Sequence, residues 1–566
     1  MRRLIIALLT LLSITAYPAI AQVIGTTPTA VASGSGQRFV FGSSPWRFGT
    51  AGFWTTDASS VNETNDVWLP PLPGGGWVVF ANFSLSISGS SNSAAVVREQ
   101  YPGNINTIDW ATVFTSSGGS GTATALSFAD GQASAIMQSG GFAFLWVPPS
   151  SATRWLRYSI TTPLGGKRPQ GANGTAGSIG VQLAEVKRWK SAFVSGEKTS
   201  GAITGSVPYN NNGFAGPSLL LEPWVGQSSV LMLADSIGQQ DDVAAYFASA
   251  RNMVGAIPRG LDDPTNGRAG VGNFTNHGAN MLDFMATGSG YFSSRAAIIA
   301  YARTVLNSGR MWPMTAIWSE LGRNDLHNGI ASTADNAAIV TAMKARYGQW
   351  WDWLQATYRD VPIIQSTIAP YSNSSDQWTT VTGQTSREAP ANTTALGEIN
   401  GWLAGKPSPL TAVVDWSSAF LGADQGDNVP RWQETPFSTA GGGLTTVAIT
   451  TSPTVSSTNT GVTFSATVAP QIGEYLVIEP ASSSNFERIY VRTVTDNGDG
   501  TFTVKGIGNY AGSSINFSRA HAVGSVVRSA YVTDGVHPGT AMQVLMSDPV
   551  KSAKANAPLT AGAQTP

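Results

Sequence analysis

The sequence predicts a mixed α/β protein: a domain with a doubly wound parallel sheet, accompanied by an N-terminal β-sandwich and a small inserted β domain. Between residues 226 and 425, short apolar runs alternate with helical patterns, which is typical of parallel strands joined by crossover helices. Before residue 225, and again between residues 426 and 528, short strand-like runs are separated by clusters of Ser, Gly and Asn. This pattern therefore predicts a β domain in each of these two regions.

The expected elements follow from hydrophobic periodicity and turn residues. The N-terminal domain is expected at residues 22–225, with strands at 77–88, 122–129, 141–147, 154–161 and 178–187. The α/β domain is expected at 226–425 and 529–553, with strands at 229–233, 315–321, 361–368 and 412–416 and helices at 241–256 and 334–358. The inserted domain is expected at 426–528, with strands at 445–450, 462–468, 474–479, 488–495 and 501–505. Residues 554–566, rich in Ala, Pro and Thr, predict a flexible tail.

Residues 1–21 have the pattern of a secretory signal peptide. Arg2 and Arg3 supply the positive start, residues 4–16 form an apolar stretch too short to span a membrane, and Ala19-Ile20-Ala21 is a small-x-small cleavage site. We expect a mature chain that starts at Gln22 and is periplasmic or secreted. No later stretch is long and apolar enough to predict a membrane span.

The composition narrows the class of protein. Charged residues make up 12% of the chain, and the net charge is −1 without a long basic run, which argues against nucleic-acid binding. The absence of Cys excludes disulfides, Cys-ligated zinc and a thiol nucleophile. The segment 496–500 faintly resembles a calcium loop but is better explained as a hairpin turn. We expect no metal and no cofactor, and the oligomeric state stays open.

The 18 Trp residues have two interpretations, and half of them lie before residue 225. Exposed Trp can stack on sugar rings, whereas most aromatic side chains fill cores. Trp46, Trp54, Trp68, Trp77, Trp110 and Trp146 are the candidates in the N-terminal domain. On the expected helix at 334–358, Trp350, Trp351 and Trp353 cannot all face the same way.

Ser236 is a candidate nucleophile because it directly follows the apolar run 229–233, which is suited to a buried parallel strand. Ligands of parallel sheets bind beyond the carboxyl ends of the strands. The start of the helix that is expected next offers backbone N–H groups to a developing negative charge. The alternative interpretation is a Ser that only caps this helix.

The chain has four His residues, so few side chains can serve as a general base near neutral pH. His537 lies three residues after Asp534, a spacing that puts both on one side of a helical turn. The carboxylate could then orient the imidazole while its other nitrogen takes a proton from Ser236. The alternative is a capped surface turn.

Two further residues are candidates for stabilising an oxyanion. Asn324 follows the expected strand 315–321, where its side-chain N–H could donate to such an oxygen. Gly278 lies in the polar turn 273–280 and has no side chain to shield its backbone N–H. Ordinary loop chemistry and a plain turn glycine are the alternatives.

Taken in chain order, these segments resemble the SGNH hydrolases, also called the GDSL-type esterases. That family has four blocks: Gly-Asp-Ser, a Gly in an Asn-x-x-x-x-Gly loop, Gly-x-Asn-Asp and Asp-x-x-His-Pro. The matching segments here are Ala234-Asp235-Ser236, Asn273 to Gly278, Gly322 to Asp325, and Asp534 to Pro538. The resemblance covers about 229–423 and 529–553 and departs from the family pattern at Ala234, where the family has Gly.

The resemblance implies a role for each matching residue. Ser236 would be the nucleophile, with Asp534 and His537 completing the triad. The backbone N–H groups of Ser236 and Gly278 and the side chain of Asn324 would form the oxyanion hole. His277 and His327 flank the oxyanion donors and could contact the substrate, but we favour a structural hydrogen bond for each. We interpret His521, in the expected insertion, as unrelated to catalysis.

The expected function is an exported serine esterase that works through an acyl-enzyme without a cofactor. Export, β modules and abundant Trp favour an acylated polysaccharide, such as one with O-acetyl groups, as the ester substrate. A lipase, lysophospholipase or short-chain esterase is the alternative within the enzymes, and an acyl transferase is chemically adjacent. A non-catalytic surface protein that binds glycans is the alternative of another class.

Overall fold

The computed structural model describes residues 37–43, 46, 48, 53–56, 62–85, 95–116, 119, 121–169, 186–190, 216–239, 255–262, 267–330, 335–387, 394–434, 462–465, 469–470, 475–479, 482, 486–507, 525–532 and 536–556. The expected signal peptide, the strand at 445–450, His521, Asp534 and nearly all of the helix expected at 241–256 lie outside these residues. Within the described part, no helix combines the length and the apolarity needed to cross a bilayer.

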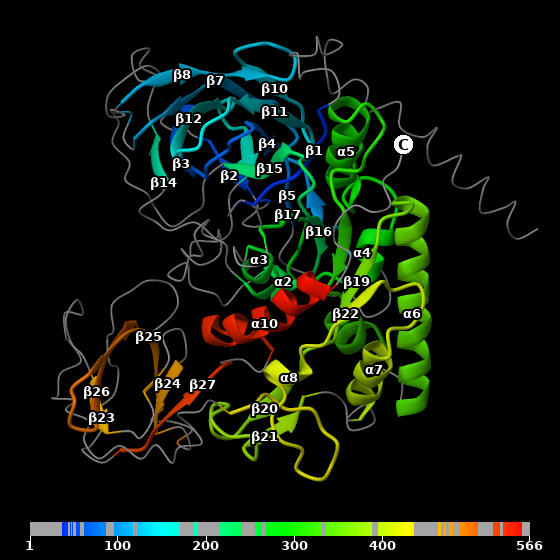
Figure 1. Cartoon of the computed structure of the whole chain (residues 1–566), viewed down its shortest axis with the longest axis vertical. Coiled ribbons are helices and arrows are strands. Elements are labelled where there is room, and N and C mark those ends of the chain that lie inside the picture. Colours follow the sequence, from blue (N-terminus) through cyan, green and yellow to red (C-terminus); the bar gives the residue numbers. More distant parts are fainter. Residues whose placement is uncertain are drawn as a thin grey trace, which may run out of the picture.

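The N-terminal region contains two antiparallel sheets, drawn in blue, cyan and blue-green in Figure 1. The first has the order β1 (Phe39–Phe41), β15 (Pro217–Pro223), β4 (Gly76–Ala81), β11 (Phe142–Val147), β9 (Ser127–Phe128). The second has the order β10 (Ala135–Met137), β7 (Asn106–Phe114), β12 (Arg154–Thr161), β3 (Asn62–Leu69), β14 (Val186–Lys190), with β8 (Ala123–Ala125) beside β7. Two short pairs accompany them: β2 (Phe53–Thr55) with β13 (Lys167–Pro169), and β5 (Ser84–Leu85) with β6 (Glu99–Gln100).

Both sheets contribute side chains to one hydrophobic cluster. Along β12, Leu156, Tyr158 and Ile160 belong to it, as the two-residue period of a strand requires. From the other sheet, Phe80 packs on Tyr158 with ring centroids 4.8 Å apart. The Trp residues of this region mostly serve the core: Trp46, Trp77 and Trp110 are buried, and Trp68 and Trp146 are half-buried.

The α/β region is built on a five-stranded parallel sheet. Its order is β17 (Gly270–Asn273), β16 (Ser229–Leu233), β18 (Ala316–Ser319), β19 (Ile363–Ser366), β22 (Ala412–Val414). Its helices are α2 (Ser236–Gln239), α3 (Ala256–Leu261), α4 (Met281–Met285), α5 (Ser293–Tyr301), η5 (Ala302–Leu306), η6 (Asp325–Ile330), α6 (Asn336–Thr357), α7 (Ala395–Ala404), α8 (Ser417–Phe420) and α10 (Thr540–Asn556). A short hairpin, β20 (Ser372–Ser374) with β21 (Gln384–Ser386), follows β19.

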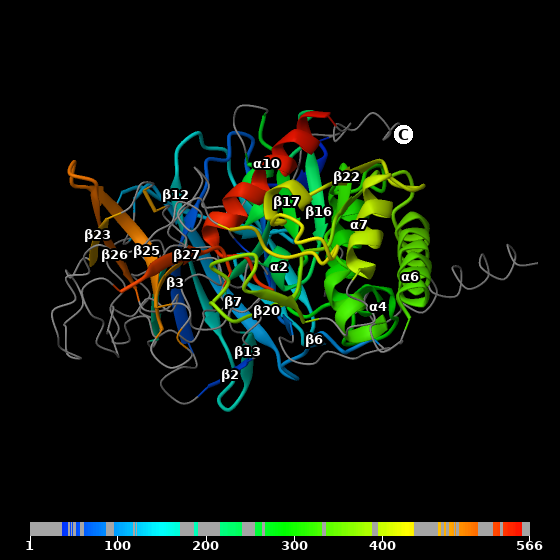
Figure 2. The same cartoon turned by 90° about the horizontal axis from the view of Figure 1, so that it is seen from below.

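Both faces of this sheet are covered. Leu231 and Leu233 of β16 lie in a core with α4, α5, α6 and α7, whereas Val230 and Met232 lie in a second core with α3, α8 and α10. The alternation of neighbouring residues between two faces explains why β16 is apolar from Val230 to Leu233. Figures 1 and 2 show α6 and α7 on one side of the sheet and α10 on the other.

Helix α6 follows the expected helix at 334–358 closely. Asp335 caps it by accepting a hydrogen bond from Ala337 N at 2.9 Å. Trp350 and Trp351 are both buried, and Trp353 is half-buried and stacks on Trp350 with ring centroids 5.2 Å apart. The three Trp side chains thus lie on two faces of the helix, and all three pack in or against the same hydrophobic core.

The third sheet is antiparallel and is drawn in orange at the lower left of Figure 1. Its order is β23 (Val462–Ser465), β26 (Thr501–Ile507), β25 (Glu487–Asp496), β24 (Tyr475–Ile478), β27 (Val527–Ala530). The expected hairpin joins β25 to β26, where Asn497 N donates to Thr501 O at 3.1 Å. Strand β27 runs across the boundary that the sequence predicts at 528, because it pairs with β24.

The ends of the α/β region also extend beyond their expected bounds. Trp432 is fully buried in the core that faces α10, although the insertion is expected from residue 426. Helix α10 continues to Asn556, where the sequence predicts a flexible tail from 554. Lys554 is buried there and donates to Leu261 O at 2.9 Å, which fixes the last turn against α3.

The N-terminal sheets and the α/β region share a core. Phe39 and Phe41 of β1 belong to the same cluster as Leu231 and Phe274, and the rings of Phe41 and Phe274 are 5.5 Å apart. A Cβ atom at Gly272 would lie 2.6 Å from the Phe41 ring, so a glycine is required there. Phe41 N also donates to Pro313 O at 2.8 Å. The two regions therefore pack as parts of one folded body.

Candidate active site

Ser236 lies where the sequence predicts it, just beyond the carboxyl end of β16 and at the first residue of α2. β16 pairs in parallel with β17 and with β18, so it is an interior strand of the sheet. The side chain that binds the free N–H at the start of α2 is Asp235, whose Oδ1 accepts from Ile237 N at 2.9 Å. Asp235 therefore acts as the cap, which leaves the Ser236 hydroxyl free for another partner.

That partner is His537. Its Nε2 lies 2.8 Å from Ser236 Oγ, although the two residues are 301 positions apart. His537 stands between β27 and α10, held by the bridge between Val532 and Pro538 and by the hydrogen bond from Gly539 N to Tyr531 O at 2.7 Å. The distance is that of a hydrogen bond, and an imidazole in this position can take the hydroxyl proton.

Helix α10 holds this segment against the rest of the site. Its Gln543 accepts a hydrogen bond from Ala256 N at 2.7 Å and donates to Ile237 O at 3.4 Å, so it joins α10 to both α3 and α2. Residues 536–539 precede α10 and are not helical. Asp534 lies outside the described residues, so its place beside His537 stays a prediction.

Asn324 joins three of the four segments that resemble the family blocks. Its Nδ2 donates to Asp235 Oδ2 at 2.9 Å and to Ala279 O at 3.1 Å. Both hydrogens on this nitrogen therefore have acceptors in the structure. A substrate oxyanion would have to share one of these hydrogens or replace Ala279 O as acceptor.

Gly278 has a φ of 65°, in the left-handed region that favours glycine. It is half-exposed, and the neighbouring Ala279 is held in the turn by a hydrogen bond from its N–H to Asn276 O at 3.1 Å. The segment returns to the sheet because Asn276 N donates to Ala234 O at 3.0 Å. The turn around Gly278 is thus anchored next to the strand end that precedes Ser236.

Ala234 stands where the family that the sequence resembles has Gly, and this has a local consequence. The Ala234 methyl group packs against Gly238 so closely that a Cβ at position 238 would overlap it. Ala234 is completely buried. The extra methyl group is therefore accommodated by a glycine four residues later, on the far side of Ser236.

A buried pair of carboxyl groups, Asp235 and Glu320, lies next to Ser236, and no short sequence pattern indicates it. Glu320 Oε2 accepts from Asp235 N at 3.2 Å, and the two side chains also bond to each other. Burial raises the pKa of Asp235, and burial together with Asp235 raises the pKa of Glu320 well above its ordinary value. Asp235 accepts hydrogen bonds at both oxygens, from Ile237 N at Oδ1 and from Asn324 Nδ2 at Oδ2, as a carboxylate does. The raised pKa of Glu320 favours the protonated form of that side chain.

The two other His residues near the site have different surroundings. The ring of His277 lies 6.0 Å from that of His537, so it borders the candidate base. His327 packs edge-on against Tyr371 at 4.4 Å, and burial, with Arg323 and Arg387 nearby, lowers its pKa to about 4. His327 is therefore uncharged near neutral pH, which fits the structural role that the sequence analysis gives it.

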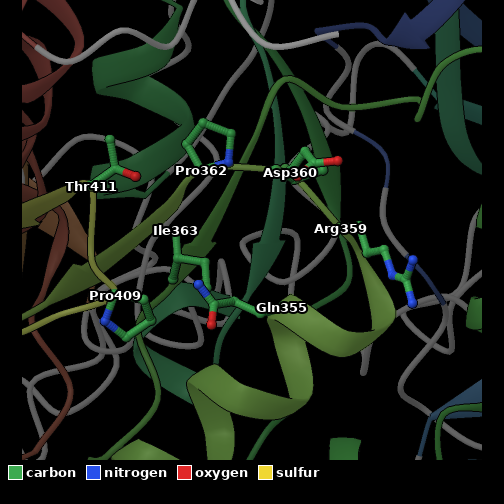
Figure 3. A pocket seen from close by; sticks show the side chains of 8 residues that line it. Gln355, Arg359, Asp360, Pro362, Ile363, Pro409 and Thr411 are labelled. Atoms are coloured by element: carbon green, nitrogen blue, oxygen red, sulfur yellow. The ribbon is translucent and has the colours of Figure 1, made fainter. Parts of the chain in front are cut away.

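A separate cavity of about 340 Å³ opens at the amino ends of the parallel strands β19 and β22 (Figure 3). It is lined by Gln355, Arg359, Asp360, Val361, Pro362, Ile363, Pro409 and Thr411. Ile363 is the first residue of β19, whereas Ser236 follows the last residue of a parallel strand. The cavity is therefore distinct from the site around Ser236. Among the described residues, no cluster of His, Asp or Glu is arranged to hold a metal ion.

Comparisons with known proteins give distant structural likenesses. No protein-family model matches the sequence, and no match is found among curated proteins. A protein of Chitinophaga pinensis described as a possible lipase is 10% identical, with a TM-score of 0.24, over 57% of this chain and 96% of that one. A family 2 carbohydrate esterase of Corynascus thermopiles, with a carbohydrate-binding domain, is 15% identical, with a TM-score of 0.22, over 68% and 93%.

Phospholipase A1 from Streptomyces albidoflavus is 13% identical, with a TM-score of 0.22, over 38% of this chain and 96% of that one. With identities and TM-scores this low, these likenesses carry no argument about the activity of this chain. What the site can do follows from its own geometry.

Proposed function

We propose that this chain is a serine ester hydrolase of the SGNH type, with Ser236 as nucleophile and His537 as general base. The observation that supports the proposal most directly is the 2.8 Å contact between Ser236 Oγ and His537 Nε2 at the carboxyl end of a parallel strand. A hydroxyl is a weak nucleophile at neutral pH unless an adjacent base takes its proton. This contact supplies such a base.

The proposed reaction has two halves. Ser236 Oγ attacks the ester carbonyl carbon while His537 Nε2 takes the hydroxyl proton, and His537 then gives this proton to the alcohol oxygen as the ester C–O bond breaks. Water next attacks the acyl-enzyme and gives a proton to His537. That proton returns to Ser236 Oγ when the carboxylic acid leaves, so the enzyme is regenerated.

In this proposal the oxyanion of each tetrahedral intermediate is stabilised by the backbone N–H groups of Ser236 and Gly278 and by the Asn324 side chain. The hydrogen bonds from Asn324 to Asp235 and Ala279 support the assignment, because they hold its amide between the Ser236 and Gly278 segments. Asp534 is proposed as the carboxylate that orients His537, on the strength of the sequence spacing alone.

The favoured substrate is an O-acetyl or similar ester on a polysaccharide, met outside the cytoplasm. Support comes from the signal-like start of the sequence and from the β-rich regions on either side of the α/β region. In this proposal the two N-terminal sheets form a β-sandwich domain, and residues 426–528 form an inserted domain. None of the N-terminal Trp side chains that the structure describes is exposed, since Trp46, Trp77 and Trp110 are buried and the others are half-buried, so they add little support for glycan binding.

The proposal is tested with p-nitrophenyl acetate and purified wild-type and Ser236→Ala protein. We expect turnover by the wild type and almost none by the variant, because the alanine cannot form the acyl-enzyme. Absence of Ser236-dependent release would reject the esterase and favour the non-catalytic glycan-binding protein. If the activity is present, acetyl against octanoyl esters, and acetylated xylan against phospholipid, distinguish a polysaccharide esterase from a lipase.

A further inference from the structure

One arginine of the N-terminal region reaches into the turn that contains Gly278. Arg98 Nη2 donates to Gly278 O at 2.7 Å, and Arg98 Nη1 lies 3.4 Å from His277 O. Its Nε forms an ion pair with Asp283 of α4 at 3.0 Å. A single guanidinium group from outside the parallel-sheet region thus contacts both peptide groups that flank Gly278.

This contact is deeply buried. The Arg98 side chain is 0% exposed and that of Asp283 is 1% exposed. Asp283 also forms the capping box of α4, in which Asn280 N donates to Asp283 Oδ2 at 2.9 Å and Asp283 N to Asn280 Oδ1 at 3.1 Å. Arg98 therefore binds a turn that is already fixed at its other end, and the ion pair supplies the charge that a buried guanidinium requires.

The backbone around Arg98 is held just as firmly. Arg98 N and Glu99 N both donate to Gly290 O, at 2.6 and 2.8 Å. Glu99 Oε1 accepts from Arg295 Nε at 2.9 Å, and Glu99 Oε2 accepts from Ser294 N at the start of α5 at 2.8 Å. Neighbouring residues thus attach the same segment to two elements of the α/β region. The backbone from which the Arg98 side chain extends is therefore held in place.

The geometry of the peptide group connects this contact to catalysis. The peptide between His277 and Gly278 is planar and trans, so its C=O and its N–H point in opposite directions. A donor that holds His277 O on one side directs the Gly278 N–H to the other side. The hydrogen bond to Gly278 O fixes the next peptide, and the two together hold Gly278 at its φ of 65°.

We propose that Arg98 is a positioning residue for the oxyanion hole, and that the N-terminal β region in this way completes the active site. Arg98 does not touch the substrate in this proposal. It holds the turn so that the Gly278 N–H keeps the direction needed to stabilise the oxyanion. The inference rests on the proposed function only in the role that it gives to Gly278.

The test compares Arg98→Lys and Arg98→Met with a matched control, Arg157→Met. Arg157 is equally buried and forms an ion pair with Asp66 at 2.7 Å, but both residues belong to the N-terminal sheets and not to the turn. Arg98→Lys keeps the positive charge near Asp283, although an ammonium group cannot reproduce the fork that reaches two carbonyls and a carboxylate. This variant keeps the test decisive if Arg98→Met does not fold.

The measurements are kcat and KM for p-nitrophenyl acetate, and hydrogen exchange of peptides that span residues 273–283. We expect Arg98→Lys to lose about 10²-fold in kcat, with a smaller change in KM, because a turn displaced by about 1 Å weakens transition-state stabilisation. Amide hydrogen exchange in the peptides that span residues 273–283 should become faster in both Arg98 variants. Arg157→Met should keep the wild-type kcat and exchange pattern while it lowers the melting temperature.

A wild-type kcat in Arg98→Lys, or unchanged exchange in 273–283, would overturn the proposal. A kcat loss in Arg157→Met as large as that in the Arg98 variants would also overturn it, because it would show a general effect of destabilisation. If the wild type shows no Ser236-dependent turnover, the proposed function fails. Hydrogen exchange still decides in that case whether Arg98 orders the turn.

Discussion

At the scale of single residues, the candidate site depends on a division of tasks between neighbours. Asp235 caps α2 and accepts from Asn324, which leaves the Ser236 hydroxyl to His537. The sequence points to Ser236, His537, Gly278 and Asn324 because each stands in a recognisable short segment. The structure brings Ser236 and His537 into contact and ties Asn324 to the turn of Gly278 through Ala279.

The partners of these residues could not be predicted in the same way. Glu320 meets Asp235 only because two adjacent parallel strands end side by side, and Arg98 meets Gly278 only because two regions pack together. No short motif marks either contact. Asp534, the remaining candidate, rests on its spacing from His537.

The proposed role of Asn324 gives a prediction at this scale. Asn324→Ala should lower kcat for p-nitrophenyl acetate by about 10²–10³-fold, the usual cost of removing one oxyanion donor. Asn307→Ala is a suitable control, because Asn307 is at least as buried as Asn324 but its side chain binds Phe39 in β1, which belongs to an N-terminal sheet. An Asn324→Ala enzyme of unchanged rate would refute the assigned role.

At the scale of elements, most of the buried parallel strands were predictable because their apolar runs are continuous, whereas β17, with the sequence Gly-Val-Gly-Asn, was not predicted. β16, β18 and β19 all lie within expected strands. β3 was not predicted, because its sequence Asn-Glu-Thr-Asn-Asp-Val-Trp-Leu is too polar to indicate a buried strand. Its acidic residues are nevertheless buried, since Glu63 pairs with Arg168 and Asp66 with Arg157. Ion pairs between strands that are far apart in sequence leave no local pattern.

The carboxyl pair between β16 and β18 predicts a dependence of stability on pH. Burial and Asp235 raise the pKa of Glu320 well above its ordinary 4.5, so the folded chain keeps this proton at pH values where the unfolded chain has lost it. The stabilisation is therefore complete below about pH 4.5 and is lost as the pH rises toward the raised pKa.

Glu320→Gln cannot ionise, yet it keeps a donor for Asp235. We expect its melting temperature to fall less than that of the wild type between about pH 5 and about pH 8. Scanning calorimetry at the two pH values checks this expectation. Parallel curves for the two proteins would show that Glu320 does not hold a proton in the folded state.

At the scale of the whole molecule, the N-terminal sheets and the α/β region stabilise each other. Their shared core contains Phe41, which is fully buried and contacts the Phe274 ring. The sequence indicates separate domains because composition and periodicity change near residue 225. It does not indicate that β1 packs on β17, since this contact joins two short segments more than two hundred residues apart in the printed sequence.

The shared core predicts cooperative unfolding of the two regions. Phe41→Ala should lower the free energy of unfolding by about 3–5 kcal/mol, the range for a buried Phe replaced by Ala. Urea unfolding is followed by Trp fluorescence and by far-ultraviolet circular dichroism. Within each protein, wild type or variant, the curves from the two signals should coincide. Val225→Ala, at a side chain that is 88% exposed, should change the free energy by no more than about 0.5 kcal/mol. Two separate transitions would contradict a shared core.

The most direct test of the account is covalent labelling with a fluorophosphonate, followed by mapping of the modified peptide. Such a reagent reacts with a serine whose hydroxyl proton is taken by a neighbouring base. We expect one adduct, on Ser236, and strongly reduced labelling in His537→Ala, because the imidazole 2.8 Å from Ser236 Oγ is then missing. An adduct on another residue, or labelling of Ser236 that does not depend on His537, would contradict it.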